Sequence, residues 1–379
     1  MYAPGRRWRP QEKPTNPSNN HLTIKKEYFI MKKVISLVLS VMMMLTMFAG
    51  CRASGTAETA APTAAPTSAT TAETAADTTT PAAQEFNVAI VQQLDHASLD
   101  EIRTAIVAQL QAQAEEKGVK VNIQEFNGQN DATVLNQIGA QVVGDGVDLI
   151  IPIATLAAQC MVTAADGTDI PIVYAAISDP EAAGLTGLSN VTGTSDALNT
   201  AFILDMMLAA NPDIKTVGLL YSNSEANSAT PIAEAKAYLQ EKQIDFVEKT
   251  GNTSGEVVEA AASMVGRVDA VFTPTDNVVM AAEVTVAETL NEAGIPHYTG
   301  ADSFVATGAF ATCGVNYTEL GTYTADMAMD ILLGGAVPEF HVMDGGIITV
   351  NTETAATLGI DYSAFASMAN TVVEVKTGE

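Results

Sequence analysis

The residues that could perform catalysis lie near the start of the folded part of the chain, where Asp95 and His96 are adjacent and Ser98 follows. In an acid–histidine–serine relay the three side chains hydrogen-bond in turn, and two neighbouring residues do not reach that geometry. Ser98 also lacks the glycine-flanked turn that presents a serine nucleophile. We therefore interpret His96 as a loop or cleft-lining histidine and predict that the protein is not an enzyme.

Metal, redox and phosphate chemistry also lack their usual sequence patterns. Cys51, Cys160 and Cys313 form no C-x-x-C pair and have no histidine at the spacing of zinc ligands. The Gly-Asp-Gly sequence at 144–146 lacks the third glycine of a dinucleotide-binding turn and precedes a predicted strand instead of a helix. The sequence therefore predicts no metal ion and no cofactor.

Hydroxyl, amide and carboxylate side chains gather instead at the ends of apolar runs, where a ligand could be bound without being transformed. In the first half of the folded body these residues are Thr155, Gln159, Ser178 and Asp179. In the second half they are Asn223, Asn227, Ser228, Asp276 and Asn277. Side chains of these types also cap helices and form turns, and one residue can fill both roles. Together with His96 we call them the predicted binding set.

Short apolar runs that alternate with amphipathic stretches would position this set. Strands are expected at 86–91, 119–123, 148–151, 170–174, 216–221, 244–247, 268–272 and 295–298. Helical periodicity lies between them, as in the stretch with Ile102, Ile106 and Leu110. Such alternation predicts parallel sheets whose loops at the carboxyl ends of the strands are functional. The series occurs on both sides of an extended segment at 190–194, so we predict an α/β protein of two doubly wound, Rossmann-like lobes with a central cleft.

The composition argues against a nucleic-acid partner. The formal net charge is -26 at pH 7, and the first 51 residues are net basic, so the remaining chain is more acidic still. A surface of this kind repels phosphate backbones. Hydrophobic residues make up 47% of the chain and aromatic residues 6%. That balance favours an α/β protein rich in aliphatic residues over an aromatic-rich β-sandwich.

The N-terminus carries a predicted export signal. The basic segment Met31–Lys33 is followed by an apolar core at 34–48. This core is shorter than the roughly 20 residues that cross a membrane, but it suits a signal peptide. Two small residues then precede Cys51 and resemble a bacterial lipobox, in which the cysteine is acylated and becomes the mature N-terminus. We predict a lipoprotein signal at 31–51, with an ordinary signal peptide as the alternative.

The segments on either side of this signal have different compositions. Residues 1–30 are polar and precede the basic end of the signal, so we interpret them as an upstream segment and Met31 as the true start. Residues 52–85 are almost entirely Ala, Thr, Pro, Ser and acidic residues with no apolar periodicity. A segment of this composition builds no core and is expected to be a disordered tether.

Five strings occur in order along the folded body and together resemble one family. They are IATLAAQ at 153–159, PIVYAAISDP at 171–180, NVTGTSD at 190–196, GLLYSNSEANS at 218–228 and TPTDNVV at 273–279. They resemble the ABC-transporter substrate-binding family that includes tryptophan- and tyrosine-linked binding proteins of Gram-positive bacteria. The likeness covers residues 86–365.

This resemblance implies a type I periplasmic-binding-protein fold, in which two lobes are joined by three hinge crossings. By analogy, lobe 1 comprises residues 86–197 and 308–335, and lobe 2 comprises 198–307 and 336–379. From the lipobox we further expect a lipid anchor on Cys51 that holds the protein at the outer face of the cell membrane, and we expect a monomer. An amino acid, with an aromatic one favoured, is the implied ligand, and a permease with its ATPase are the implied partners.

A zwitterionic amino acid needs donors for its carboxylate and an acidic partner for its ammonium. The folded body has two arginines, Arg103 and Arg267, and both lie in amphipathic helical stretches. The carboxylate is therefore expected at hydroxyls and helix N-termini such as that of Thr155. Asp276 is the expected ammonium partner, with helix capping as its alternative role. Leucine-like ligands also remain open, as do a sensor ectodomain and a lipid-anchored enzyme.

Overall fold

The computed structural model describes residues 84–378, all of which lie in one of the two compact units of the chain. The predictions for the upstream segment 1–30 and for the signal at 31–51, including Cys51, lie outside the described residues. So does the predicted tether, except for its last two residues, of which Glu85 already belongs to the first strand.

The first sheet has six strands in the order β11-β5-β4-β3-β1-β2, and all of its pairings are parallel. Its strands are β1 (Glu85–Gln92), β2 (Lys120–Asn127), β3 (Leu149–Ile153), β4 (Ile172–Tyr174), β5 (Val191–Ser195) and β11 (His341–Val342). Central strands of a parallel sheet are covered on both faces, which accounts for their continuous apolar runs. We call this sheet and the helices packed on it lobe 1.

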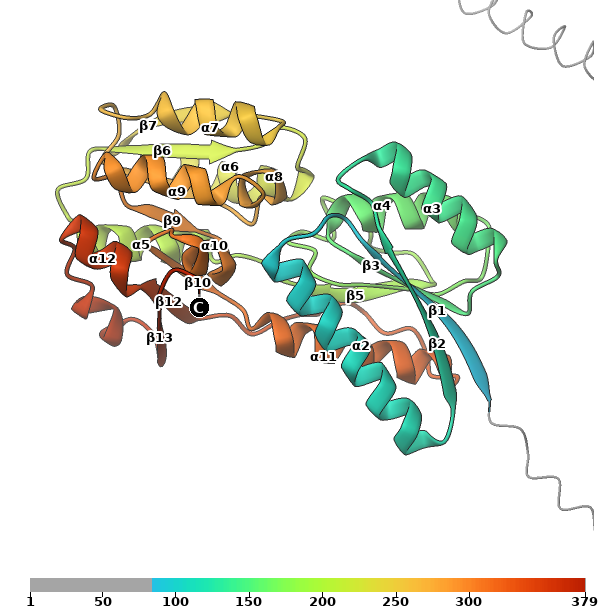
Figure 1. The fold of residues 1–379 in the computed structure, drawn as a ribbon. Helices are drawn as coiled ribbons and strands as arrows, with labels where there is room; N and C mark the ends of the chain where they lie inside the picture. Colours follow the sequence, from blue (N-terminus) through green and yellow to red (C-terminus); the bar gives the residue numbers. More distant parts are fainter. Residues whose placement is uncertain (1–83, 379) are drawn as a thin grey trace, which may run out of the picture. The chain divides into compact units, whose positions relative to one another are not determined.

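Helices cover both faces of the first sheet (Figure 1). They are α2 (Ala97–Lys117), α3 (Ala132–Gly144), α4 (Thr155–Ala164) and α11 (Tyr317–Leu332). Side chains alternate along β1, so that Val88 and Ile90 pack in the core with α2 and α11. Ala89 and Val91 point to the opposite face and pack in a second core with α3 and α4. The helix α2 ends at Gly118, whose φ of 65° is the left-handed conformation that glycine adopts readily.

The second sheet has seven strands in the order β13-β12-β10-β9-β8-β6-β7. Its strands are β6 (Thr216–Tyr221), β7 (Asp245–Thr250), β8 (Ala270–Thr273), β9 (His297–Thr299), β10 (Ala311–Gly314), β12 (Ile347–Asn351) and β13 (Thr371–Val375). The pairing of β10 with β12 is antiparallel, and the other pairings are parallel. We call this sheet and its helices lobe 2.

Lobe 2 is layered in the same way. Its helices are α5 (Thr200–Ala210), α6 (Ala229–Glu241), α7 (Ser254–Ala262), α8 (Asn277–Met280), α9 (Glu283–Glu292), α10 (Asp302–Thr307) and α12 (Thr352–Leu358), with 3-10 turns η1 (Ala226–Ser228) and η2 (Ser363–Ser367). Leu219 and Phe272 pack with α5 and α6 on one face. Leu220 and Val271 pack with α7 and α9 on the other. The predicted α/β class with two doubly wound lobes is therefore confirmed.

The chain passes between the two sheets three times, at 196–199, 315–316 and 343–346. Two of these positions differ from the expected lobe boundaries. The return to lobe 1 was expected near residue 308, but β10 completes the second sheet between β9 and β12, so the crossing follows Gly314. Residues 336–342 were expected in lobe 2, whereas β11 pairs with β5 in the first sheet.

Candidate functional site

A small cavity lies where residues that follow the strands of both lobes meet. Its volume is about 30 Å³. Six members of the predicted binding set line it: His96, Thr155, Ser178, Asn227, Asp276 and Asn277. A single water needs roughly 10–15 Å³ measured in this way. The cavity therefore has room for no more than a few water molecules.

Two strained alanines shape the lobe 1 side of the cavity. Ala154, at the end of β3, has φ 75° and ψ 162°, a conformation found almost only in glycine. Ala176, just after β4, has φ 57°. The backbone N–H of Ala154 donates to Ala175 at 3.0 Å, which joins the two turns. These turns bring Thr155 and Ser178 to the cavity wall, as the sequence predicted for residues that follow strands.

Asp196, which follows β5 at the first crossing, supplies a buried carboxylate to the cavity wall. Its Oδ1 accepts from Ser178 at 3.0 Å, and its Oδ2 accepts from the Tyr317 hydroxyl at 3.1 Å. Burial raises the pKa of Asp196, although these two hydrogen bonds lower it. Because each carboxylate oxygen can accept about two hydrogen bonds, both oxygens keep accepting capacity.

Asp276 differs from Asp196 because its accepting capacity is filled. Its Oδ1 accepts from the backbone N–H groups of Val278 and Val279 at 3.1 and 3.0 Å, and so caps α8. Its Oδ2 accepts from Ser222 N–H and the Ser228 hydroxyl, both at 2.7 Å. All four donors belong to lobe 2. The arrangement favours the capping role over the ammonium contact that the sequence also allowed for Asp276.

Asn277 joins two titratable groups across the lobes. Its Nδ2 donates to Glu225 Oε2 at 2.6 Å, and its Oδ1 lies 3.0 Å from His96 Nε2. Since the amide oxygen is an acceptor, His96 must carry its proton on Nε2. Glu225 Oε1 in turn accepts from Gln93 Nε2 at 3.0 Å, so lobe 1 and lobe 2 meet at both ends of this network.

Two buried acceptors beside the cavity have no partner among the described residues. One is Asn227 Oδ1, whose own Nδ2 donates to the Thr275 carbonyl at 2.6 Å. The other is Nδ1 of His96, a lone pair once Nε2 holds the proton. With the spare capacity of Asp196, these atoms make the cavity rich in acceptors. Neither Arg103 nor Arg267 lines it, and Arg103 pairs with Glu125 at 2.6 Å.

The other members of the predicted binding set lie outside the cavity lining. Gln159 donates to the Ala183 carbonyl at 3.0 Å, and Asn223 donates to Thr250 Oγ1 at 3.0 Å on the surface. Asp179 accepts from the Thr230 hydroxyl at 2.7 Å and so joins the lobes away from the cavity. Ser228 supports the carboxylate of Asp276.

Sequence reasoning missed several cavity residues. Asp196 ends the string at 190–196 and Tyr317 begins α11, so their places after a strand and at a helix start were available signals. Gln93 and Glu225 meet only through the approach of the two lobes, which no local pattern reveals.

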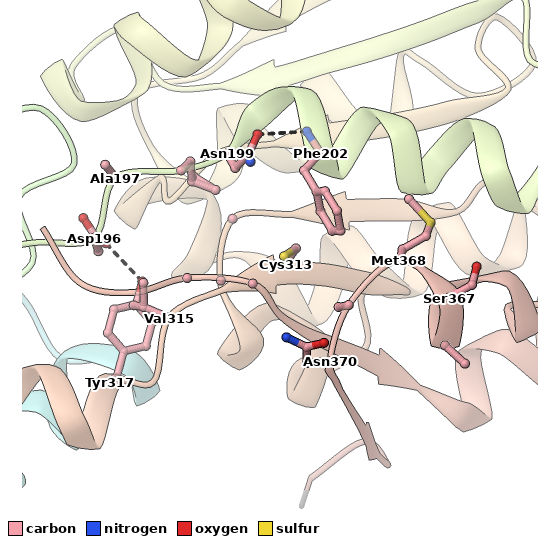
Figure 2. A pocket seen from close by; sticks show the side chains of 17 residues that line it. Asp196, Ala197, Asn199, Phe202, Cys313, Val315, Tyr317, Ser367, Met368 and Asn370 are labelled. Carbon is pink, nitrogen blue, oxygen red and sulfur yellow. Dashed lines mark hydrogen bonds between the residues drawn. The ribbon is translucent and has the colours of Figure 1, made fainter.

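A second, larger hollow of about 570 Å³ lies along the three crossings. Phe202 of α5 and Met368, after η2, line it together with Cys313 and Asn370 (Figure 2). Asp196 and Tyr317 border both hollows. The three crossings therefore border a hollow that is open to solvent on this side.

Two further properties of residues 84–378 bear on function. This part of the chain has no helix of the length and hydrophobicity needed to span a bilayer. In the same residues, no three His, Cys, Asp or Glu side chains come together in a way that could hold a metal ion.

The chain is similar in sequence and fold to several known proteins. A tyrosine-binding protein of Clostridioides difficile (strain R20291) is 32% identical over 286 residues, which cover 74% of this chain and 82% of the relative. The solved structure of an ABC domain in complex with L-Trp from Streptococcus pneumonia is 30% identical, with a TM-score of 0.71 over 76% of this chain and 100% of that one.

A ligand-free, open structure of a substrate binding protein with adhesive properties from Clostridium difficile is 33% identical, with a TM-score of 0.59 over 77% of this chain and 99% of that one. These neighbours confirm the type I periplasmic-binding-protein fold. The family described as ABC transporter substrate binding protein matches residues 87–373. With three quarters of its length matched in this way, the chain belongs to the ABC transporter substrate binding protein family.

Proposed function

We propose that this protein captures an amino acid, with an aromatic one preferred, between its two lobes and delivers it to an ABC importer. Its family consists of solute-binding proteins and not of enzymes, as the sequence predicted. Two relatives near 30% identity are named for tyrosine and for L-Trp, which supports an aromatic amino acid as the ligand here.

The acceptor-rich cavity is the observation that carries the proposal. An α-ammonium group brings three N–H donors and a positive charge. Asp196 has spare accepting capacity on a buried carboxylate, and Asn227 Oδ1 and His96 Nδ1 have no donors of their own. An ammonium group bound among them would satisfy these acceptors and offset the cost of burying the Asp196 charge.

The other ends of the ligand have candidate partners as well. The ligand's carboxylate suits the Thr155 hydroxyl at the start of α4, because a helix N-terminus carries positive potential. The ligand's side chain could contact Phe304, Leu99 and Met280, which are apolar residues of the cavity lining. Aromatic and thioether groups contact an aromatic ring favourably. A leucine-like ligand would be disfavoured by only about 1–3 kcal/mol per methylene of misfit.

Lobe movement is the mechanism that we propose for capture. The cavity of about 30 Å³ requires the lobes to separate before an amino acid enters. The TM-score is higher against the L-Trp complex than against the open structure, at similar identity, which supports a closed arrangement of the lobes in this protein. The ligand then needs only a higher affinity for the closed form to shift the equilibrium toward it.

Calorimetry on the full chain with L-tryptophan, L-tyrosine, L-phenylalanine and L-leucine tests the ligand. We expect one site per chain and tighter binding of at least one aromatic amino acid than of leucine. D-tryptophan is the matched control, because it keeps the indole but misplaces the ammonium. If no aromatic amino acid binds at millimolar concentration while another solute class raises the melting temperature, the ligand assignment is wrong.

A further inference from the structure

We propose that Gln93, Glu225, Asn277 and His96 form an interlobe latch that closes with both of its titratable groups uncharged. Closure then makes Glu225 take up a proton and His96 release one. The inference deepens the proposed function, because it concerns how closure of the same lobes responds to pH. Because His96 Nδ1 also faces the proposed ammonium site, a measurement without ligand is needed to separate the latch from ligand binding.

On the lobe 1 side of the latch, hydrogen bonds within lobe 1 fix the side chain of Gln93. Gln93 is fully buried. Its Oε1 accepts from Leu156 N–H at 3.0 Å, and its Nε2 also donates to Asn130 Oδ1 at 2.8 Å. The same Nε2 reaches Glu225 across the lobes at 3.0 Å. Gln93 is therefore already oriented by lobe 1 when Glu225 approaches.

Within residues 84–378, no positive charge acts on Glu225 when the lobes are together. Its side chain is 6% exposed, and its hydrogen-bond donors are the neutral amides of Gln93 and Asn277. Of the elements packed around it, α8 presents Asp276 at its start, and α4 brings only Cys160 as a titratable group. On α6, Lys236 pairs with Glu248 and Glu234 bonds to Thr200.

These surroundings oppose an ionised Glu225. Burial, and then the negative charge of Asp276, raise the pKa of Glu225 from 4.5 to about 7, despite the amide hydrogen bonds that lower it. When the lobes separate, Gln93 leaves and water reaches the carboxyl group. The contribution of burial to the pKa is then lost, while the charge of Asp276 stays beside Glu225 within lobe 2. Closing the lobes therefore takes up protons as the pH falls below about 7.

His96 responds in the opposite direction. Burial lowers its pKa from 6.5, although Asn277, Asp100 and Asp95 raise it. A protonated ring would also bury an N–H at Nδ1, which has no acceptor among the described residues. Closing the lobes therefore releases a proton from His96 below about pH 6.5. The two effects oppose each other, so closure of the native protein should depend less on pH than closure of a variant that lacks one of the two groups.

Single variants should reveal the two opposed responses. L-tryptophan affinity of the full chain is measured by calorimetry from pH 5 to 8 for the native protein, Glu225→Gln and His96→Gln. With His96→Gln, affinity should rise as pH falls below about 7, by at most tenfold per pH unit. With Glu225→Gln, affinity should fall as pH drops below about 6.5, again by at most tenfold per pH unit. Glu259→Gln, on the exposed face of α7, is the matched control.

A second measurement removes the dependence on ligand identity. Small-angle X-ray scattering of the same four proteins without ligand reports lobe separation as a radius of gyration. His96→Gln should become more compact, and Glu225→Gln more extended, as pH falls. If both variants follow the native profile in scattering, the latch is overturned. If L-tryptophan does not bind at any pH while the scattering trends diverge, the ligand is wrong and the latch stands.

Discussion

Asp196 and Asp276 are both buried carboxylates beside the same cavity, but their hydrogen bonds give them different roles. Asp276 accepts four hydrogen bonds within lobe 2 and caps α8. Asp196 accepts one on each oxygen, from Ser178 and Tyr317. Substitution by asparagine preserves the shape of either residue. Asp276→Asn therefore tests the contribution to stability, and Asp196→Asn tests the contribution to ligand binding.

For Asp276→Asn we expect a loss of stability. The amide would place N–H donors where Ser222 N–H and the Ser228 hydroxyl now donate, and an unsatisfied buried donor costs about 1–3 kcal/mol. Urea denaturation measures the free energy of unfolding. An unchanged unfolding free energy together with a more than tenfold loss of L-tryptophan affinity would restore Asp276 as the ammonium partner.

Asp196→Asn should instead weaken ligand binding. Removing one member of a buried charged contact costs about 2–5 kcal/mol, whereas Ser178 and Tyr317 can still donate to the amide oxygen or reorient. Calorimetry with L-tryptophan measures the affinity, and the melting temperature checks the fold. Native affinity in a folded Asp196→Asn protein would contradict the proposed ammonium site.

The sequence located cavity residues where local rules suffice. Thr155, Ser178 and Asp276 were found because each follows a strand, and the carboxyl ends of parallel strands share one edge of a sheet. Contacts between the lobes were beyond such rules. Gln93 and Glu225 are 132 positions apart, and their hydrogen bond depends on how two separately folded sheets meet.

At the scale of elements, the strands β1 to β4 and β6 to β9 were predicted to within a few residues, whereas β12 was not predicted although it is buried. The segment 190–194, expected as an extended crossing, is in fact the strand β5. The sequence pattern did not predict the edge strands β11 and β13, because β11 is two residues long and β13 is mostly exposed. Such edge strands are defined by their pairing partners and not by an apolar run of their own.

The turn from β3 to α4 stores backbone strain that can be measured. Ala154 occupies a region where non-glycine residues cost about 1–3 kcal/mol. We expect Ala154→Gly to raise the free energy of unfolding by about 1 kcal/mol, since glycine adopts this conformation without a steric penalty.

Urea denaturation tests this expectation against Ala157→Gly, a matched substitution inside α4. That control should lower the unfolding free energy by about 1 kcal/mol, because glycine disfavours helix interiors. If Ala154→Gly is as destabilising as Ala157→Gly, the turn is not strained.

At the scale of the whole molecule, attachment to the membrane is the main proposal that lies outside residues 84–378. Family membership makes an extracytoplasmic location the expected one. We propose that Cys51 is acylated after cleavage of the signal at 31–51. Cys51→Ser should abolish incorporation of a palmitate analogue and release the protein into the medium. Equal labelling of native and variant protein would reject the lipid anchor.

The three crossings also constrain the order in which this protein can fold. Lobe 1 needs α11 to cover its sheet, and lobe 2 needs β12 and β13 to extend its own, yet all three elements lie beyond residue 316. Lobe 1 therefore cannot complete its core before α11 has been synthesised, and lobe 2 cannot complete its sheet before β13 has been synthesised. Pairings between such distant segments form slowly. The chain thus has no finished domain until α11 is available, which leaves most of its length to fold late in synthesis.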